Sequence, residues 1–489
     1  MSVFIKQYKA RSNNSATVIQ VVFKKGRQVT KTKHIGTAHT EDEVALLRAI
    51  ATDYINENQS VLFEKEQDGE SIVMVGAYSK LLYDTLESVY VRLGFDCIGD
   101  DVFKDLVIAR IIEPTSKLDT IRVLSELGLD APSNTSIHRS LRRAIDKCYR
   151  DSIGHACFAC VSPTAHSLIL YDVTTLYFEA QKEDDFRKSG MSKERRLDPQ
   201  IVVGLLTDAS GFPLALSSFE GNCAETKTII PVLEEFKAQY DLDDIVVVAD
   251  AAMLSGSNLE TLEKLGYHYI VASRIAKTPF EVEELVAKGP LTDGQIIDTE
   301  QSFTIAHKRQ KRRVIYQYRH KRANLDLRNI DKAVQKALKM TSGSTAFKRN
   351  RFLSVKGAKK EINWELVESA KARAGIKGYV TNTDVCTQEV IAAYHRLFQI
   401  EKSFRMSKSD LKARPIFHRK RDSIEAHLTI VFASLAMSHY IQERTGLSIR
   451  KFMQKLKVIR HGKLKINGKI RDVPPAISEE IDDLLVKLL

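Results

Sequence analysis

The chain has 489 residues, a formal net charge of +12 and a sequence pI near 9.2. This length is enough for several domains with hydrophobic cores of their own, and a basic balance suits a polyanionic partner such as DNA. The longest apolar stretch, residues 428–437, is too short to cross a bilayer, and the N-terminus lacks a signal-peptide pattern. These features exclude a membrane partner and predict a cytoplasmic location.

The first segment, residues 1–75, is predicted to be a small appendage. Residues 16–23 and 28–35 alternate in the manner of strands and flank a Lys-Lys-Gly-Arg turn, which predicts a β-hairpin. A helix is expected from about residue 41 to residue 56.

The second segment, residues 76–160, is predicted to be helical, with helices over 101–113, 115–128 and 137–143. Short helices, tight turns and arginines on the last helix are compatible with helix-turn-helix binding of DNA. The alternative is that these arginines only solubilise an exposed helix face. The arginines concerned are Arg139, Arg142 and Arg143.

Two cysteines near the end of this segment, Cys157 and Cys160, form the one motif-like pair among six cysteines. A zinc site would need a second pair at suitable spacing, and none is present. A helix face is therefore preferred to a metal site.

Residues 161–277 predict the order strand, strand, strand, helix, strand, helix, strand. The first strand, 166–172, is an apolar run ending in Asp172, and the fourth, 244–250, is an apolar run ending in Asp250. An aspartate after a strand often only caps the next helix, so the order of elements matters more than either residue alone.

Residues 278–375 form a connection longer than such a sheet requires, which predicts a domain inserted into the sheet's sequence. It carries basic residues interleaved with tyrosines, a pattern that suits a strand pair lying along a DNA backbone. A charged, solvated hairpin is the alternative. The basic residues expected to contact DNA are Lys308, Arg309, Lys311, Arg312 and Arg313.

Residues 394–408 predict one helix that places Tyr394, Glu401, Phe404 and Lys408 on a shared face. A carboxylate between a hydroxyl and an ammonium suits a metal ion beside a DNA phosphate. The spacing resembles the Tyr/Arg/Glu/Lys signature of bacterial insertion-sequence DDE transposases. Leu397 stands where that signature has Arg, with Arg396 one residue early. Arg405, one turn past Glu401, is the candidate to contribute instead.

The resemblance implies a fold and an active site. The fold class is α/β: a ribonuclease H-like mixed sheet flanked by helices, interrupted by the insertion, preceded by the hairpin and the helical DNA-binding region. The core would comprise 161–277 and 376–442, followed by a C-terminal region, 443–489. Asp172, Asp250 and Glu401 would be catalytic and would bind two Mg²⁺ ions, with Mn²⁺ as a substitute.

The resemblance also implies partners: double-stranded DNA, both terminal inverted repeats and target DNA, with a homodimer on paired ends in the nucleoid. DNA contacts are expected from Tyr394, Arg396, Arg405 and Lys408. A hairpin DNA intermediate, also implied, would involve a flipped base, for which the single tryptophan, Trp364, is a candidate stacking platform. A buried core position is the preferred interpretation of Trp364.

Three alternatives stand beside the transposase. A ribonuclease H-like nuclease would share the three acids, and a non-catalytic, transposase-derived DNA-binding protein would not need them intact. A phosphatase-like hydrolase with Asp172 as nucleophile would favour a second aspartate at Thr174. The sequence contains no glycine-rich phosphate loop, so it does not indicate use of ATP.

Overall fold

The computed structural model describes the chain apart from residues 1, 11–12, 27, 59–71, 162–167, 180–181, 192–196, 241–244, 252–254, 274–279, 306–307, 343, 345–349, 357–358, 467–468 and 489. The chain divides into two compact units, Met1–Ile72 and Val73–Leu489.

The N-terminal unit is a three-stranded antiparallel sheet, β1-β2-β3, with one helix. Side chains from the middle strand and the helix form its core, which contains Ile19, Val21, Phe23 and Ala51. The predicted hairpin and helix are confirmed, whereas strand β1 was not expected. The elements are β1 (Ser2–Ala10), β2 (Asn13–Lys25), β3 (Gln28–Ala38) and α1 (Glu41–Asn58).

Helices dominate the first part of the second unit, as predicted. The side chain of Asp100 caps α3 by accepting from the N–H of Phe103, and that of Ser133 caps α5 by accepting from the N–H of Ser136. The helices are α2 (Lys80–Arg92), α3 (Asp101–Ile112), α4 (Thr120–Glu126), α5 (Asn134–Asp146) and α6 (Tyr149–Cys160).

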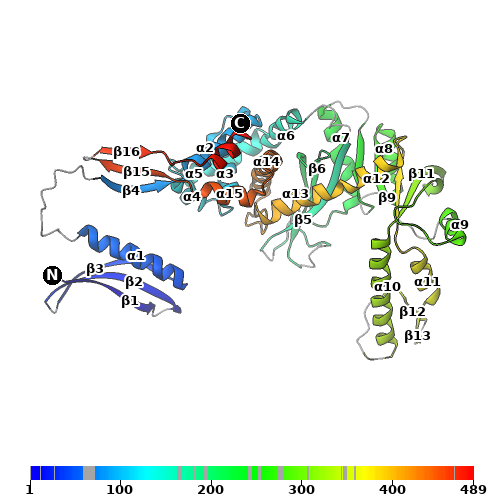
Figure 1. Cartoon of the computed structure of the whole chain (residues 1–489), viewed down its shortest axis with the longest axis horizontal. Helices are drawn as coiled ribbons and strands as arrows, with labels where there is room; N and C mark the ends of the chain where they lie inside the picture. Colours follow the sequence, from blue (N-terminus) through cyan, green and yellow to red (C-terminus); the bar gives the residue numbers. More distant parts are fainter. Residues whose placement is uncertain are drawn as a thin grey trace. The chain divides into compact units, whose positions relative to one another are not determined.

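These helices gather around α14 (Arg421–Thr445), which packs against α3, α5 and α6 (Figure 1). By length and composition alone α14 could cross a membrane, but 83% of its apolar window is buried inside the protein. It is therefore the central helix of a folded core.

An eight-stranded mixed sheet forms the centre of this unit, in the order β10-β11-β14-β9-β8-β5-β6-β7. Neighbouring strands are antiparallel except β5, β8 and β9, which run parallel. The first five strands in sequence order are β5 (Leu168–Tyr177), β6 (Gln200–Thr207), β7 (Pro213–Glu220), β8 (Val246–Ala249) and β9 (His268–Ser273).

The predicted alternation of these strands with helices is confirmed, with α7 (Ile229–Tyr240) and α8 (Gly256–Lys264) in the expected places. One boundary was wrong. Strand β5 does not end at Asp172 but continues to Tyr177, because β6 pairs with it as far as Gln200.

The segment predicted as an insertion has two parts. Its hairpin, β10 (Ile296–Ile305) and β11 (Lys308–Tyr318), extends the central sheet by pairing with β14 (Ile376–Thr381). The second part has a small core of its own, formed by Ile330, Val334, Phe352 and Val367. Its helices lie side by side at one edge of the sheet (Figure 1). They are α10 (His320–Thr341) and α11 (Trp364–Ala372), with the hairpin β12 (Leu353–Lys356) and β13 (Lys359–Ile362); α9 (Phe280–Lys288) precedes β10.

The preferred interpretation of Trp364 as a core residue was wrong. Its side chain is 54% exposed at the start of α11. The small core beside it is filled by Val367 and residues of α10 instead.

The single helix predicted over 394–408 is two helices, α12 (Thr387–His395) and α13 (Leu397–Ser409), which meet at Arg396. Arg396 itself keeps helical dihedrals, with φ −65° and ψ −16°, so the interruption is confined to this one residue. Phe404 is buried whereas Glu401 is exposed.

The C-terminal region returns to the helical part. Strand β15 pairs with β16 and with β4, so the chain's end joins the start of the second unit. The elements are β4 (Ile72–Tyr78), α15 (Ile449–Lys457), β15 (His461–Ile466), β16 (Lys469–Val473) and α16 (Glu479–Val486).

Candidate active site

The two candidate aspartates come from adjacent parallel strands. Strands β5 and β8 pair with Leu168 opposite Val246 and Leu170 opposite Val248. Continuing this register by two residues places Asp172 opposite Asp250. Neighbouring strands lie about 4.8 Å apart, so the two carboxylates project from the same edge region of the sheet.

Each aspartate is held locally by its own backbone. Asp172 Oδ1 accepts from the N–H of Val173 at 2.8 Å, and Asp250 Oδ1 accepts from the N–H of Ala251 at 2.7 Å. Asp250 lies just beyond β8 and is exposed, whereas Asp172 lies within β5 and is half-buried.

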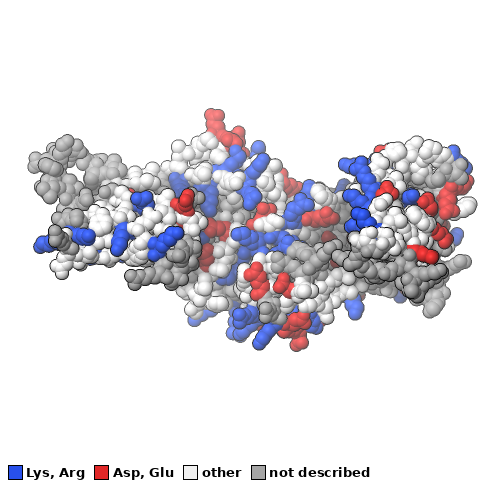
Figure 2. Space-filling view, turned by 90° about the horizontal axis from the view of Figure 1, so that it is seen from below, with Lys and Arg blue, Asp and Glu red and all other residues white. Residues whose placement is uncertain are grey.

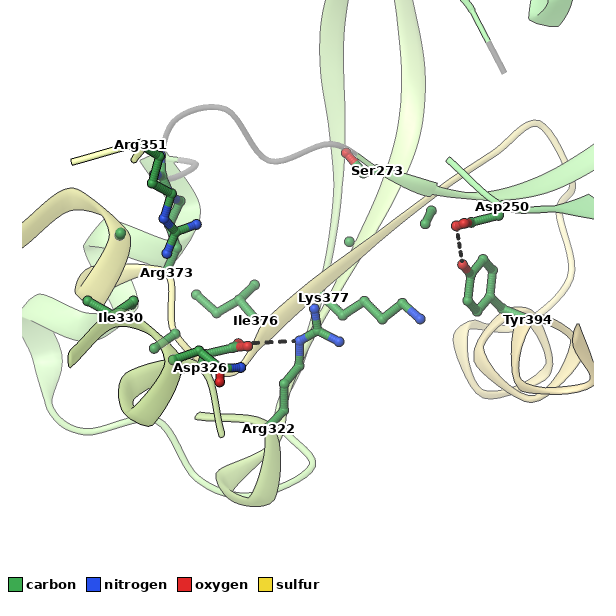
Figure 3. A pocket seen from close by; sticks show the side chains of 15 residues that line it. Asp250, Ser273, Arg322, Asp326, Ile330, Arg351, Arg373, Ile376, Lys377 and Tyr394 are labelled. Carbon is green, nitrogen blue, oxygen red and sulfur yellow. Dashed lines mark hydrogen bonds and ion pairs between the residues drawn. The ribbon is translucent and has the colours of Figure 1, made fainter. Parts of the chain in front are cut away.

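Tyr394 connects α12 to this edge. Its hydroxyl donates to Asp250 Oδ1 at 3.2 Å (Figure 3). Its ring packs edge-on against Tyr379 of β14. Burial, followed by the Asp250 carboxylate, raises the pKa of the Tyr394 hydroxyl. The hydroxyl stays protonated at neutral pH and so remains a donor to Asp250.

Glu401 is brought to the same region by α13, which packs against β5. The Lys377 ammonium, 4.0 Å from the centre of the Tyr394 ring, feels the charges of both Asp250 and Glu401. Its pKa is lowered, first by burial and then by the Arg322 guanidinium, while the two carboxylates act in the opposite direction. Lys377 thus links the second and third acids electrostatically.

The carboxylates fit Mg²⁺ in kind, since hard cations prefer carboxylate oxygens and retain several waters. Within the described part of the chain, however, no three His, Cys, Asp or Glu side chains are arranged so that they could hold one ion together. The backbone therefore brings the aspartate strands together, but the three side chains do not form a closed cage.

The other residues predicted around Glu401 differ in exposure. Arg396 and Arg405 are exposed, Lys408 is half-buried, and Leu397 packs against the main core. Leu397, packed against the core, does not take the role of the signature's Arg. Arg396 and Arg405 remain the candidates for that role, because both are basic and exposed.

The basic strand β11 does not present one continuous DNA surface. Lys311 is exposed, but Arg312 is only 6% exposed and its Nη2 lies 3.2 Å from Glu263 Oε1. Arg313 is bound to Asp298 at 2.7 Å and to two backbone carbonyls. The predicted DNA contact is therefore wrong for Arg312 and does not suit Arg313. The side chains of Lys308 and Arg309 lie outside the described residues.

The three arginines of α5 differ in their exposure and ion pairing. Arg139 and Arg142 are exposed, whereas Arg143 binds the buried carboxylate of Asp100 at 2.7 Å. The Arg143 side chain is 41% exposed beside this ion pair, so a DNA contact by Arg143 stays a prediction. Cys157 is buried on α6 and Cys160 lies on the same helix, in line with the preferred helical interpretation.

Sequence reasoning missed Lys377 and three arginines, Arg322, Arg351 and Arg373, which line a pocket of about 590 Å³ that reaches Asp250 and Tyr394 (Figure 3). Only Lys377 had a recognisable signal: it is the one charged residue in the apolar run 376–380. Arg322 lies on α10, Arg351 in the turn before β12 and Arg373 just after α11, so only folding brings the three together.

Comparison with known proteins establishes the family. The family described as the transposase DDE domain matches residues 163–437, more than half of the chain, and the chain belongs to this family. No curated protein matches. Among solved structures, the chain is similar to a piggyBac transposase in a cryo-EM structure of its synaptic complex with hairpin DNA. Identity is 10%, coverage is 80% of this chain and 82% of that chain, and the TM-score is 0.40.

Proposed function

We propose that this member of the family is the transposase of a bacterial insertion sequence, which cleaves DNA at the ends of its element and transfers the strand to target DNA. Asp172, Asp250 and Glu401 are the catalytic acids. The observation that carries the proposal is the register of β5 and β8, which sets the first two acids side by side.

The topology supports a ribonuclease H-like core. In sequence order the first and fourth strands, β5 and β8, are neighbours, and the second and third extend the sheet on the far side of β5. This arrangement is the one that the resemblance requires, with Glu401 supplied by a later helix, α13, that packs on β5.

In the reaction, an oxygen nucleophile forms a bond to phosphorus while the bond to the departing 3′ oxygen breaks. Two Mg²⁺ ions, with Mn²⁺ as a substitute, would stabilise the charge on both oxygens when held by the three acids. Tyr394 orients Asp250 through its hydrogen bond, and Lys377 places a positive charge beside the same carboxylate. Lys408, Arg396 and Arg405 would hold neighbouring phosphates.

The same proposal includes its partners: terminal inverted repeats, target DNA and a second copy of the chain on paired ends. It also includes a cytoplasmic, nucleoid-associated location. The family and the basic net charge of +12 support a DNA partner.

The test is single-turnover cleavage of a labelled terminal-repeat duplex in Mg²⁺ by Asp172→Asn, Asp250→Asn and Glu401→Gln. Each should lose at least about a thousandfold in rate with near-normal folding and DNA binding, because removing one oxygen charge impairs metal binding. Asp384→Asn and Glu389→Gln, at exposed acids on and near α12, are the matched controls.

Near-normal cleavage by any of the three would show that its residue is not catalytic. Strand transfer into a plasmid separates the alternatives: a simple nuclease would cut without joining, and a DNA-binding protein without catalysis would do neither.

A further inference from the structure

The pocket beside Asp250 is lined by more basic than acidic groups. Four basic side chains, Arg322, Arg351, Arg373 and Lys377, face two carboxylates, Asp250 and Asp326. Asp326 is already engaged, since its Oδ2 lies 3.5 Å from Arg322 Nε and accepts from the N–H of Gly375 at 3.1 Å. The pocket therefore carries excess positive charge, which favours an anion.

The basic groups are arranged along the pocket and not at one point. Figure 3 shows Asp250 and Tyr394 at one end, Arg351 and Arg373 at the other, and Arg322 and Lys377 between them. A lone inorganic phosphate would occupy a small part of about 590 Å³. An extended ligand with repeated negative charges fits the arrangement better, and guanidinium groups match phosphates in geometry as well as charge.

We propose that this pocket holds the phosphates of the DNA strand that continues past the scissile phosphate. Lys377 and Arg322 hold the phosphate next to the active site, and Arg351 and Arg373 hold the one beyond. This inference rests on the proposed function for the position of the scissile phosphate at Asp250. The segment around α10 and α11 thereby guides one DNA strand into and out of the site.

The experiment measures binding of a labelled, short oligodeoxythymidine to the full chain over a series of salt concentrations, without divalent cations. The variant R351A/R373A should bind on the order of tenfold more weakly. Its log–log salt slope should be flatter by about 0.7 for each phosphate that the variant no longer neutralises. The control R328A/K336A removes two exposed charges from α10 that do not line the pocket and should leave both quantities nearly unchanged.

Arg351 lies 4.4 Å over the Phe352 ring, so its loss could disturb the small core. The charge-retaining R351K/R373K variant addresses this and should recover most of the slope, because a lysine still neutralises a phosphate. A slope for R351A/R373A equal to that of the control would overturn the inference. The inference would also be overturned if inorganic phosphate bound the wild type and not R351A/R373A while both proteins bound the oligonucleotide equally.

Failure of this inference is distinguishable from failure of the proposed function. The binding titration does not depend on catalysis, whereas the substitutions of the three acids are expected to change cleavage and to leave DNA binding nearly normal.

Discussion

Two neighbouring tyrosines differ in what their hydroxyls do. The rings of Tyr394 and Tyr379 lie 5.0 Å apart, but only the Tyr394 hydroxyl donates to Asp250. The Tyr379 hydroxyl is buried and has no hydrogen-bond partner among the described residues. A deletion of either oxygen leaves the aromatic packing in place, so the pair isolates the role of one hydrogen bond.

Tyr394→Phe should slow single-turnover cleavage by roughly ten- to hundredfold, since hydrogen bonds to charged groups contribute about 1.5–3 kcal/mol. Tyr379→Phe should leave the rate unchanged and leave stability equal or slightly higher, because an unpaired buried hydroxyl costs free energy. Equal effects of the two substitutions on the rate would mean that Tyr394 contributes only packing.

Arg143 provides a second residue-scale prediction. Arg143→Ala should lower the free energy of unfolding by about 1–3 kcal/mol, because it leaves the buried Asp100 carboxylate without its cation. The loss is limited because the N–H of Phe103 and the hydroxyls of Ser140 and Tyr149 still donate to Asp100. Urea unfolding is the measurement.

Arg139→Ala, at an exposed position of the same helix, is the control and should change stability by less than about 0.5 kcal/mol. If both variants have the same stability as the wild type, the ion pair with Asp100 is not a structural interaction.

At the scale of elements, α14 contacts the segment after α13 through His427, which is buried, and its half-buried neighbour His418. His427 Nε2 donates to the carbonyl oxygen of Ala413, while its Nδ1 accepts from Arg110 Nη2 at 3.3 Å. The ring of His418 lies 5.5 Å from that of His427. Burial, and then the charges of Lys117, Arg110 and His138, lowers the pKa of His418 to about 4.

This junction predicts acid sensitivity. The pKa of His418 is lower in the folded than in the unfolded state, so the unfolded chain binds more protons and stability falls as pH falls from about 6.5 toward 4. Between pH 7 and pH 5 the wild type should lose roughly 1–2 kcal/mol relative to His418→Gln, a value reduced for partial exposure.

The measurement is urea unfolding of both proteins at several pH values. His155→Gln, at an exposed position on α6, should follow the wild type. Parallel pH profiles for His418→Gln and the wild type would show that His418 does not couple folding to protonation.

At the scale of the whole molecule, charge is mixed. Figure 2 shows basic and acidic side chains interspersed over one face, without a single uninterrupted basic surface among the described residues. Arg312, Arg313 and Arg143 show why the count of 74 lysines and arginines overstates the positive charge available to DNA, because Glu263, Asp298 and Asp100 already pair with them.

Duplex binding should nevertheless depend steeply on salt. Asp250→Asn, which should bind without cutting, is the protein to titrate with a terminal-repeat duplex. If the protein contacts six to ten phosphates, raising the salt concentration from roughly 50 to 200 mM should weaken the affinity for DNA by about 10³–10⁵-fold. A salt-independent affinity would show that DNA phosphates are not the partner of this charge.

The sequence by itself determined the local elements and the order of the acids. Apolar runs before Asp172 and Asp250 predicted β5 and β8, and the order of strands and helices around them is confirmed, since these signals depend on neighbouring residues. The family match spans residues 163–437, which include these strands. Apolar runs alone could not predict that Asp172 and Asp250 lie opposite each other on neighbouring strands. That prediction needed the strand order implied by the family resemblance.

Only the tertiary structure decided which charged and aromatic side chains face outward. Arg312 and Trp364 were misjudged because burial depends on partners distant in sequence: Glu263 covers Arg312, and the small core around Val367 excludes Trp364. The break at Arg396 was missed because both flanking segments have helical spacing. The basic pocket beside Asp250 was invisible for the same reason, because α10, α11 and β14 meet there only after the chain has folded.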